Sequence, residues 1–251
     1  MLKIILSGCN GKMGRVITDI INKRNDAAIV AGVDLNISQN GPFPVFNNFN
    51  DITVSADVII DFSNPAVLNN LLCFAKEKKL GVVIATTGFS DEQIADIKAA
   101  ANEIPVFFSF NMSLGINLLA ELCRKAANIL EGFDIEIVEK HHNQKIDAPS
   151  GTAILLANEI NDELSGSMTY EYDRHSKREK RTPTEIGIHA IRGGTIVGEH
   201  EVIFAGRDEI ITLSHSACSK EVFAVGAVNA AFFLNGKSAG MYSMKELVAE
   251  K

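Results

Sequence analysis

The chain has 251 residues, of which 46% are apolar and 22% charged, a composition typical of one large folded domain or two smaller ones. The formal net charge of −7 argues against a nucleic-acid partner, because phosphate binding requires a basic face. The N-terminal apolar run is too short for a signal sequence, and no run approaches the roughly 20 residues that span a bilayer, so we expect a cytoplasmic protein without a membrane partner.

The four cysteines are scattered singly, at Cys9, Cys73, Cys123 and Cys218. This spacing suits reduced thiols packed as small hydrophobes better than a disulfide framework or a zinc site. The 6 histidines show no H-E-x-x-H or comparable ligand spacing, so we expect no metal.

The first predicted elements form a dinucleotide-binding pattern. Residues 3–7 are a short apolar strand, residues 8–14 a glycine-rich turn, and the residues that follow repeat apolar side chains at the helical period. Glycines in such a turn allow a pyrophosphate to approach the backbone, and the helix N-terminus attracts it. Asn10 stands where the commoner fingerprint has its second glycine, and asparagine tolerates left-handed backbone. The alternative is a purely structural turn.

A second apolar strand, residues 28–33, ends at Asp34. An acidic residue about 20 positions after the glycine motif accepts hydrogen bonds from the adenosine ribose. Its charge repels a 2′-phosphate, and Leu35 and Asn36 supply no arginine to offset that repulsion. We therefore expect NADH to bind at least as well as NADPH. The alternative is that Asp34 merely ends the strand.

Further apolar strands at residues 58–62, 81–85 and 105–109 alternate with predicted helices. This alternation predicts a Rossmann-like, doubly wound parallel sheet, in which ligands bind at the carboxyl ends of the strands. The expected cofactor contacts are Gly8, Cys9, Asn10, Gly11, Lys12, Met13, Asp34, Ala85, Thr86, Thr87, Ser109, Phe110, Asn111 and Met112.

Local signals also predict where the intervening helices begin. Ser63 is expected to cap a helix that has Pro65 in its first turn and ends at about residue 79. Ser90 and Gln93 have the spacing of a capping box for a helix that ends at about residue 102. Residues 36–50, rich in Asn, Pro and Gly, are a predicted loop.

The pattern changes in the second half. Residues 114–130 predict a long helix and residues 134–140 an alternating strand, and a further helix starts at Thr152. Three alternating runs, at residues 185–190, 195–204 and 209–215, predict an antiparallel meander. Polar residues 165–183, with a charged run at 177–181, are predicted to be a solvated loop, with a mobile lid as the alternative.

These elements predict a C-terminal α+β domain with a mixed, mostly antiparallel sheet that is open on one face. Such a face commonly packs on a partner, so we expect oligomerisation. The predicted domains are residues 1–112, which bind the dinucleotide, and residues 113–218, which bind substrate and oligomerise. A small-residue-rich helix within residues 219–251 is expected to return to the first domain.

Chemistry-bearing side chains concentrate at residues 139–152. His141, His142 and Lys145 can donate protons or bind an anion, and Ser150, Gly151 and Thr152 form a helix entry whose N–H groups suit a carboxylate. The alternative is an ordinary charged loop.

The motif H-H-x-x-K-x-D-A-P-S-G-T at residues 141–152, together with the nucleotide half, resembles dihydrodipicolinate reductases of bacterial and plant lysine biosynthesis. The resemblance covers essentially the whole chain. The other motifs that carry it are G-x-x-G-x-M-G at 8–14, T-T-G-F at 86–89, N-x-S-x-G-x-N at 111–117, R-x-G-x-x-x-G-E-H at 192–200 and S-H-x-A at 214–217.

The resemblance implies a homotetramer that reduces 4-hydroxy-tetrahydrodipicolinate, after loss of its hydroxyl, by hydride transfer from NADH or NADPH in the diaminopimelate route to lysine. It implies that His141 is the proton donor and that Lys145 is essential and also contacts substrate. His142 and the backbone around Gly151 and Thr152 correspond to the substrate carboxylate contacts, to which Ser150 is added as the helix entry. His141 and His142 reach one ligand only if the chain turns irregularly, because neighbours in a strand face opposite ways.

Two positions depart from the family pattern. Ala85 stands where glycine is usual and Lys220 where arginine is common, and lysine lacks the bidentate fork for a carboxylate. Two other functions stay open. One is a different small Rossmann dehydrogenase of the aspartate or homoserine type, and the other is a catalytically silent NADH sensor.

Overall fold

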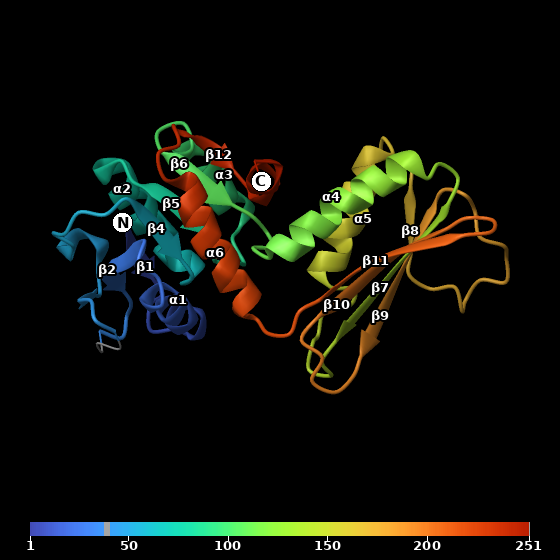
Figure 1. The fold of residues 1–251 in the computed structure, drawn as a ribbon, viewed down its shortest axis with the longest axis horizontal. Helices are drawn as coiled ribbons and strands as arrows, with labels where there is room; N and C mark the ends of the chain where they lie inside the picture. Colours follow the sequence, from blue (N-terminus) through green and yellow to red (C-terminus); the bar gives the residue numbers. More distant parts are fainter. Residues whose placement is uncertain (38–40, 251) are drawn as a thin grey trace. The chain divides into compact units, whose positions relative to one another are not determined.

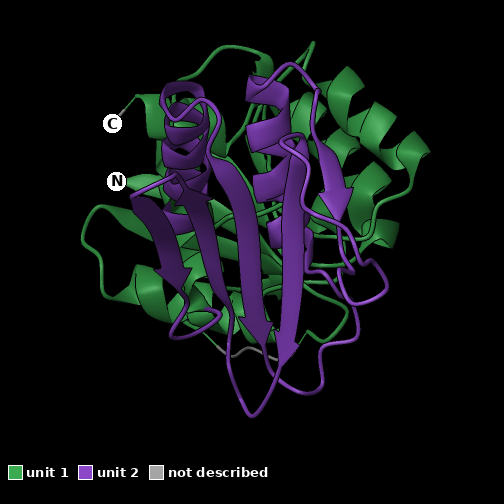
Figure 2. Cartoon of the chain, turned by 90° about the vertical axis from the view of Figure 1, so that its right-hand side faces the viewer, with its two compact units in different colours: residues 1–114, 221–251 green, residues 115–220 purple. Residues whose placement is uncertain are grey.

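The computed structural model describes residues 1–37 and 41–250. The chain forms two compact units, residues 1–114 together with 221–251, and residues 115–220 (Figure 2). Each unit has its own sheet and its own buried apolar core. None of the helices in the described ranges is long and apolar enough to cross a membrane.

The first unit is built on a seven-stranded sheet in the order β12-β6-β5-β4-β1-β2-β3 (Figure 1). Every pairing between neighbours in this sheet is parallel. The strands are β1 (Leu2–Ser7), β2 (Ala27–Val33), β3 (Val45–Phe46), β4 (Val58–Asp61), β5 (Gly81–Ile84), β6 (Pro105–Phe108) and β12 (Gly240–Tyr242).

Helices cover both faces of this sheet. Ile4 and Leu6 of β1 pack into one core and Ile5 into the other, as the alternation of a strand requires. The first core takes side chains from α1 (Lys12–Asn22), α6 (Glu221–Leu234) and α7 (Met244–Ala249). The second takes them from α2 (Leu68–Lys78) and α3 (Asp91–Ala100). The predicted Rossmann-like fold is therefore confirmed.

Several local predictions for this unit need correction. The cap after β4 is Asn64, whose side chain accepts a hydrogen bond from the Ala66 N–H at the start of a 3-10 turn, η2 (Pro65–Val67). The hydroxyl of Ser63 instead donates to Asp61. The predicted loop at 36–50 contains the short strand β3 and the start of a second 3-10 turn, η1 (Phe49–Asp51). Residues 38–40 of that loop lie outside the described residues.

The capping box at α3 is confirmed, since Ser90 accepts from the Gln93 N–H and Gln93 accepts from the Ser90 N–H. The cysteines are free thiols as expected. Packing as small hydrophobes holds for Cys9 and Cys123, whereas Cys73 and Cys218 are exposed.

The second unit has a five-stranded mixed sheet in the order β11-β10-β7-β9-β8. The strands are β7 (Asp134–His141), β8 (Thr169–Glu171), β9 (Glu185–Arg192), β10 (Glu199–Ala205) and β11 (Ile210–Ser216). Ile135 and Ile137 of β7 pack into one core with the apolar sides of α4 (Leu114–Ile129) and α5 (Gly151–Glu163). Buried residues alternate along β7, so Glu139 and His141 continue the same buried side of the strand.

The mixed sheet is confirmed, but the predicted meander is wrong. Strands β10 and β11 form a hairpin and β10 pairs antiparallel with β7, whereas β9 pairs parallel with both β7 and β8. The four described pairings are thus divided equally instead of being mostly antiparallel. An alternating pattern determines which residues share a face, but it carries no information about the neighbouring strand.

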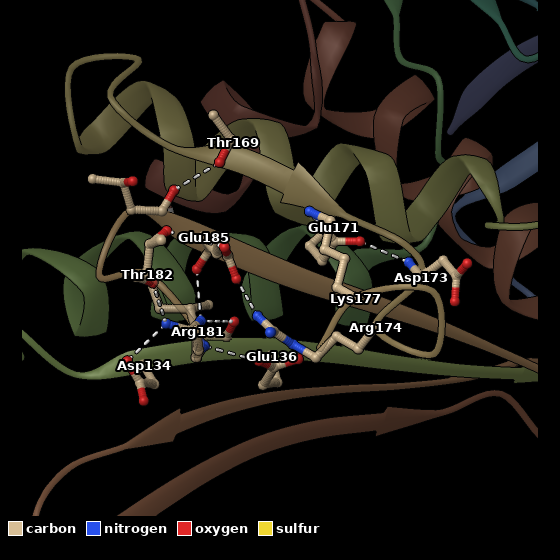
Figure 3. A network of polar contacts seen from close by, with 12 residues as sticks. Asp134, Glu136, Thr169, Glu171, Asp173, Arg174, Lys177, Arg181, Thr182 and Glu185 are labelled. Carbon is tan, nitrogen blue, oxygen red and sulfur yellow. Dashed lines mark hydrogen bonds and ion pairs between the residues drawn. The ribbon is translucent and has the colours of Figure 1, made fainter. Parts of the chain in front are cut away.

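Residues 177–180 of the charged run are exposed, as predicted for a solvated loop, but Arg181 is anchored to the sheet (Figure 3). The Arg181 side chain is only 16% exposed. Its guanidinium donates to Asp134 Oδ1 at 2.7 Å, to Glu136 Oε1 at 3.1 Å and to the carbonyls of Ile135 and Glu185. Arg181 therefore binds this segment to the first residues of β7 and β9, because a guanidinium has donors for several acceptors at once.

Candidate active site

The glycine turn of the first unit has a shape that larger residues cannot adopt. Gly8 has φ +77°, and a Cβ added there would lie 2.3 Å from the Phe62 carbonyl oxygen. A Cβ on Gly14 would lie 2.2 Å from the Gly8 carbonyl oxygen, so the first turn of α1 packs directly on the loop. Gly11 caps α1 and has no side chain to compete with an anion for the N–H groups of Lys12 and Met13.

Asp34 lies directly after β2 and is tied to the glycine turn. Its Oδ2 accepts the Asn10 N–H at 3.0 Å and its Oδ1 accepts the Asn36 N–H at 3.0 Å. Each carboxylate oxygen has a second lone pair for a ribose hydroxyl. Among the described non-glycine residues, positive φ occurs at Lys79 and Ser165, so Asn10 does not use its tolerance of left-handed backbone. Its side chain instead donates through Nδ2 to the Asn36 carbonyl.

A cavity of about 280 Å³ lies beside this turn. Its lining residues are Cys9, Asn10, Arg15, Thr18, Asp19 and Phe43. Burial raises the pKa of the Cys9 thiol to about 11, with a further contribution from Asp34, so this thiol is protonated at neutral pH. Arg15 was not predicted, and its Nε donates to the Asn10 carbonyl at 3.2 Å. Arg15 is four residues after Gly11, in the first turns of α1, and this position next to the glycine turn could have identified it from the sequence.

The carboxyl ends of β4 and β5 are joined through Asp61, which is 2% exposed. The Thr86 hydroxyl donates to Asp61 Oδ2 at 2.6 Å and accepts the Ser63 N–H at 2.8 Å. Burial raises the pKa of Asp61, against hydrogen bonds from Ser63 and Thr86 that lower it. Because the single hydroxyl proton of Thr86 goes to Asp61, the Thr86 hydroxyl cannot also donate a hydrogen bond to a ligand. Thr87 is exposed and Ala85 buried.

The segment after β6 presents residues of two kinds. Phe110 is 77% exposed and its ring centroid is 5.4 Å from that of Phe108. Met112 is 4% exposed and belongs to the core, so only its backbone can contact a ligand. Ser109 Oγ donates to the Asn111 carbonyl, and Asn111 Oδ1 accepts the Ser113 N–H at 2.9 Å. The exposed aromatic ring is the feature of this segment that packing within the chain does not explain.

The chemistry of the second unit centres on a buried carboxylate that sequence reasoning missed. Glu139 is 0% exposed. Its Oε2 lies 2.7 Å from His141 Nδ1, and its Oε1 accepts the Ser150 N–H at 2.9 Å. Arg192 donates to both oxygens, each at 2.7 Å. Burial alone would raise the pKa of Glu139, but the hydrogen bonds from Arg192, His141 and Ser150 outweigh it and hold the pKa below its ordinary value. Glu139 is therefore ionised at neutral pH.

A second buried imidazole, His200, lies against His141. The ring centroids are 5.2 Å apart and the rings are nearly perpendicular. His200 Nε2 is 3.0 Å from Ser150 Oγ. Burial, followed by the charge of His141, lowers the pKa of His200 to about 4, so His200 is neutral at neutral pH. The G-E-H motif had marked His200 within a family pattern, but nothing in the sequence assigned it a contact.

The loop after β7 carries the other predicted groups. The strand ends at His141, and a turn closed by the Lys145 N–H and the His142 carbonyl follows. Lys145 Nζ lies 2.8 Å from Asp147 Oδ1, and this hydrogen bond lowers the pKa of Asp147. The chain thus leaves the regular strand geometry directly after His141. That His142 faces the same way as His141 stays a prediction.

Helix α5 begins beside this loop. Ser150 is its cap, and its Oγ accepts the Ala153 N–H at 3.2 Å. A Cβ added to Gly151 would meet nothing within 4 Å, so packing within the chain does not require glycine there. The first turn, with Gly151 and Thr152, thus presents N–H groups and the positive end of the helix dipole beside His141, which suits an anion such as a carboxylate.

These two clusters define a class of protein. The first unit has the sheet, the glycine turn and the strand-end acid of a nicotinamide-dinucleotide oxidoreductase, and its residues fit that cofactor because the cradle at Gly8 and Gly14 tolerates no side chain. The second unit has an imidazole, an ammonium group and a helix N-terminus in residues 141–152, and these groups suit an anion.

Models for the N-terminal and C-terminal parts of dihydrodipicolinate reductase match residues 2–112 and 115–248. The chain is 53% identical over 248 residues to the 4-hydroxy-tetrahydrodipicolinate reductase of Caldanaerobacter subterraneus subsp. tengcongensis, which covers 99% of this chain and 98% of that protein. It is 52% identical over 245 residues to the reductase of the same name from Clostridium tetani, covering 97% and 96% of the two chains. The chain therefore belongs to the dihydrodipicolinate reductase family.

Solved structures agree with this assignment. A dihydrodipicolinate reductase from Paenisporosarcina sp. TG-14, with dipicolinate bound, matches with a TM-score of 0.82 at 25% identity and covers 97% of both chains. A Corynebacterium glutamicum DAP dehydrogenase matches with a TM-score of 0.55 at 14% identity, covering 100% of this chain and 96% of that one. The second likeness concerns the fold alone.

Proposed function

We propose that this enzyme reduces the unsaturated cyclic dicarboxylate formed when 4-hydroxy-tetrahydrodipicolinate loses water, giving tetrahydrodipicolinate in the diaminopimelate route to lysine. The observation that carries the proposal is the cluster around Glu139, where two family motifs far apart in the sequence contribute His141 and Ser150 from one and Arg192 from the other to one network. A silent NADH sensor has no need of such a network. An aspartate or homoserine-type dehydrogenase shares the nucleotide fold but not these motifs.

The first unit binds the dinucleotide through the turn from Gly8 to Met13, Asp34 and the ends of β5 and β6. When bound, the reduced nicotinamide supplies the hydride, which adds to ring carbon C4 of the substrate. Asp34 accepts hydrogen bonds from the adenosine ribose, so NADH binds at least as well as NADPH. Arg15, which lines the cavity beside Asn10, supplies a positive charge that attracts a 2′-phosphate and so limits the preference for NADH over NADPH.

The second unit binds the substrate. A carboxylate of the substrate lies against the N–H groups of Gly151 and Thr152, supported by Ser150 as the helix cap and by His142. Lys145 contacts the second anionic region, exchanging its bond to Asp147 for one to the substrate. As the ring is reduced, His141 donates the proton that neutralises the developing negative charge.

The outer face of the mixed sheet is the proposed contact between copies in a homotetramer. It includes apolar side chains that are unusually exposed for strand residues, at Ile191 (45%) and Ile210 (68%). Exposed apolar surface of this kind typically marks an interface. As an enzyme of amino-acid biosynthesis, the protein is proposed to act in the cytoplasm.

The test is the absorbance of NADH during incubation with the freshly generated product of the preceding synthase step, compared with aspartate semialdehyde alone. Oxidation of NADH that depends on the synthase product supports the proposal. Oxidation with aspartate semialdehyde alone would identify the other dehydrogenase class, and NADH binding without oxidation by any substrate would identify the sensor.

A further inference from the structure

We propose that Glu139 is a positioning residue for the reaction, because it fixes the ring of His141 and the first turn of α5 in a single arrangement. The proposal rests on the proposed role of His141 as proton donor. Glu139 is 0% exposed and does not itself meet a ligand, so it acts through the groups that it holds.

The hydrogen bond to His141 determines which ring nitrogen is available for chemistry. An ionised carboxylate can only accept, so the His141 Nδ1 that lies 2.7 Å from Glu139 Oε2 carries the hydrogen. The other nitrogen, Nε2, is then the atom that gains and loses a proton. Gly198 leaves room for that side of the ring, since a Cβ there would lie 3.1 Å from His141 Nε2.

The second oxygen of Glu139 holds the helix entry. Oε1 accepts the Ser150 N–H at 2.9 Å, and Ser150 caps α5. The Glu139 side chain therefore determines the position of the proposed proton donor relative to the proposed carboxylate contacts at Gly151 and Thr152. A change of rotamer at Glu139 would move both at once.

Arg192 keeps Glu139 in that rotamer. Its two terminal nitrogens bond one to each carboxylate oxygen, the planar fork that only arginine provides. Arg192 also donates to the Asp147 carbonyl at 2.6 Å, which extends the same network into the loop that carries Lys145.

The same strand offers a matched control. Glu136 also pairs with a histidine and an arginine, with 2.8 Å between its Oε2 and His189 Nε2 and 3.1 Å between its Oε1 and Arg181 Nε. It is on the opposite side of β7 from Glu139 and is 24% exposed. Glu136→Gln therefore removes an equivalent charge from an equivalent trio that has no proposed part in the reaction.

The experiment compares Glu139→Gln with Glu136→Gln in the full-length protein by steady-state kinetics, NADH affinity and 15N NMR of the histidine rings. In the wild-type protein we expect neutral His141 to be the Nδ1–H tautomer. In Glu139→Gln we expect a mixture of the Nδ1–H and Nε2–H tautomers, because a glutamine side chain can either accept or donate a hydrogen bond. We expect kcat of Glu139→Gln to fall on the order of 100-fold, the usual contribution of a positioned general acid. The NADH affinity of Glu139→Gln, and both kcat and NADH affinity of Glu136→Gln, should stay unchanged.

A double variant, Glu139→Gln with Arg192→Gln, removes both charges and guards against misfolding caused by an unpaired ion. We expect its kcat to stay low. The proposal would be overturned if the double variant regained the wild-type kcat. It would also be overturned if Glu139→Gln kept the wild-type kcat and showed only the Nδ1–H tautomer of His141. If the wild-type protein oxidises no NADH, the proposed function fails, and the NMR spectra still decide whether Glu139 sets the form of His141.

Discussion

Removing Arg192 should strongly destabilise the protein. Arg192→Ala leaves the fully buried Glu139 carboxylate without the two hydrogen bonds, each 2.7 Å long, that compensate its charge. Breaking a buried pair on one side costs about 3–5 kcal/mol. For a chain of this size each kcal/mol lowers Tm by about 2–4 °C, so we expect a fall in Tm of roughly 6–20 °C at pH 7.

The difference in Tm between the wild-type protein and Arg192→Ala should change with pH in a defined direction. The pKa of Glu139 in the folded protein lies below its ordinary value of 4.5. The stability it contributes is therefore fully present above the unfolded pKa and is lost as the pH falls through the folded pKa. Since Arg192→Ala lacks that contribution at every pH, the difference in Tm between the two proteins should narrow as the pH is lowered below about 4.5.

The assay is thermal unfolding followed by circular dichroism at pH 7 and at acidic pH, with Arg24→Ala as control. Arg24 makes a similar two-pronged contact with Asp26, at 2.8 and 2.7 Å, but on the exposed surface, so its loss should change Tm little. A Tm of Arg192→Ala within about 2 °C of wild type at pH 7, or a difference that widens on acidification, would refute the reasoning.

Three further predictions concern the ligands. His141→Ala and Lys145→Ala should each cut kcat by roughly 100-fold or more while NADH affinity measured by fluorescence titration is retained; wild-type turnover in either would remove that residue from the proposed mechanism. Asp34→Ala should narrow any preference for NADH over NADPH, judged by the two kcat/KM values, and an unchanged ratio would exclude Asp34 from the ribose contact. Gly14→Ala should abolish NADH binding, because its Cβ would lie 2.2 Å from the Gly8 carbonyl oxygen; undiminished binding in a calorimetric titration would contradict the close packing of α1 on the turn.

The nucleotide unit could be predicted from the sequence because its signals are local. The strand before Gly8, the turn and the period of α1 occupy one continuous stretch, and each buried parallel strand is a short apolar run. The proposed ribose contact of Asp34 could be predicted from its distance in sequence to the glycine motif. The role of Asn10 could not, because its N–H binds a carboxylate 24 positions away.

The second unit was predicted less completely because its arrangement depends on distant contacts. Glu139 and Arg192 are 53 positions apart, and no local pattern indicates that two charged residues will meet in the core. The place of β9 beside β7 depends likewise on pairing between distant segments. His141 and Ser150 were identified from a family motif, whereas the carboxylate that joins them became visible only in the fold.

The most direct test of the proposed reaction is transfer of deuterium from NADH deuterated at nicotinamide C4 to the synthase product, followed by NMR of the reduced ring. The proposed function predicts deuterium at ring carbon C4 of tetrahydrodipicolinate in the wild-type reaction, and a rate at least about 100-fold lower in His141→Ala. Deuterium at another carbon, or an unlabelled product, would contradict hydride transfer to C4. An equal rate in His141→Ala would contradict its role as the proton donor.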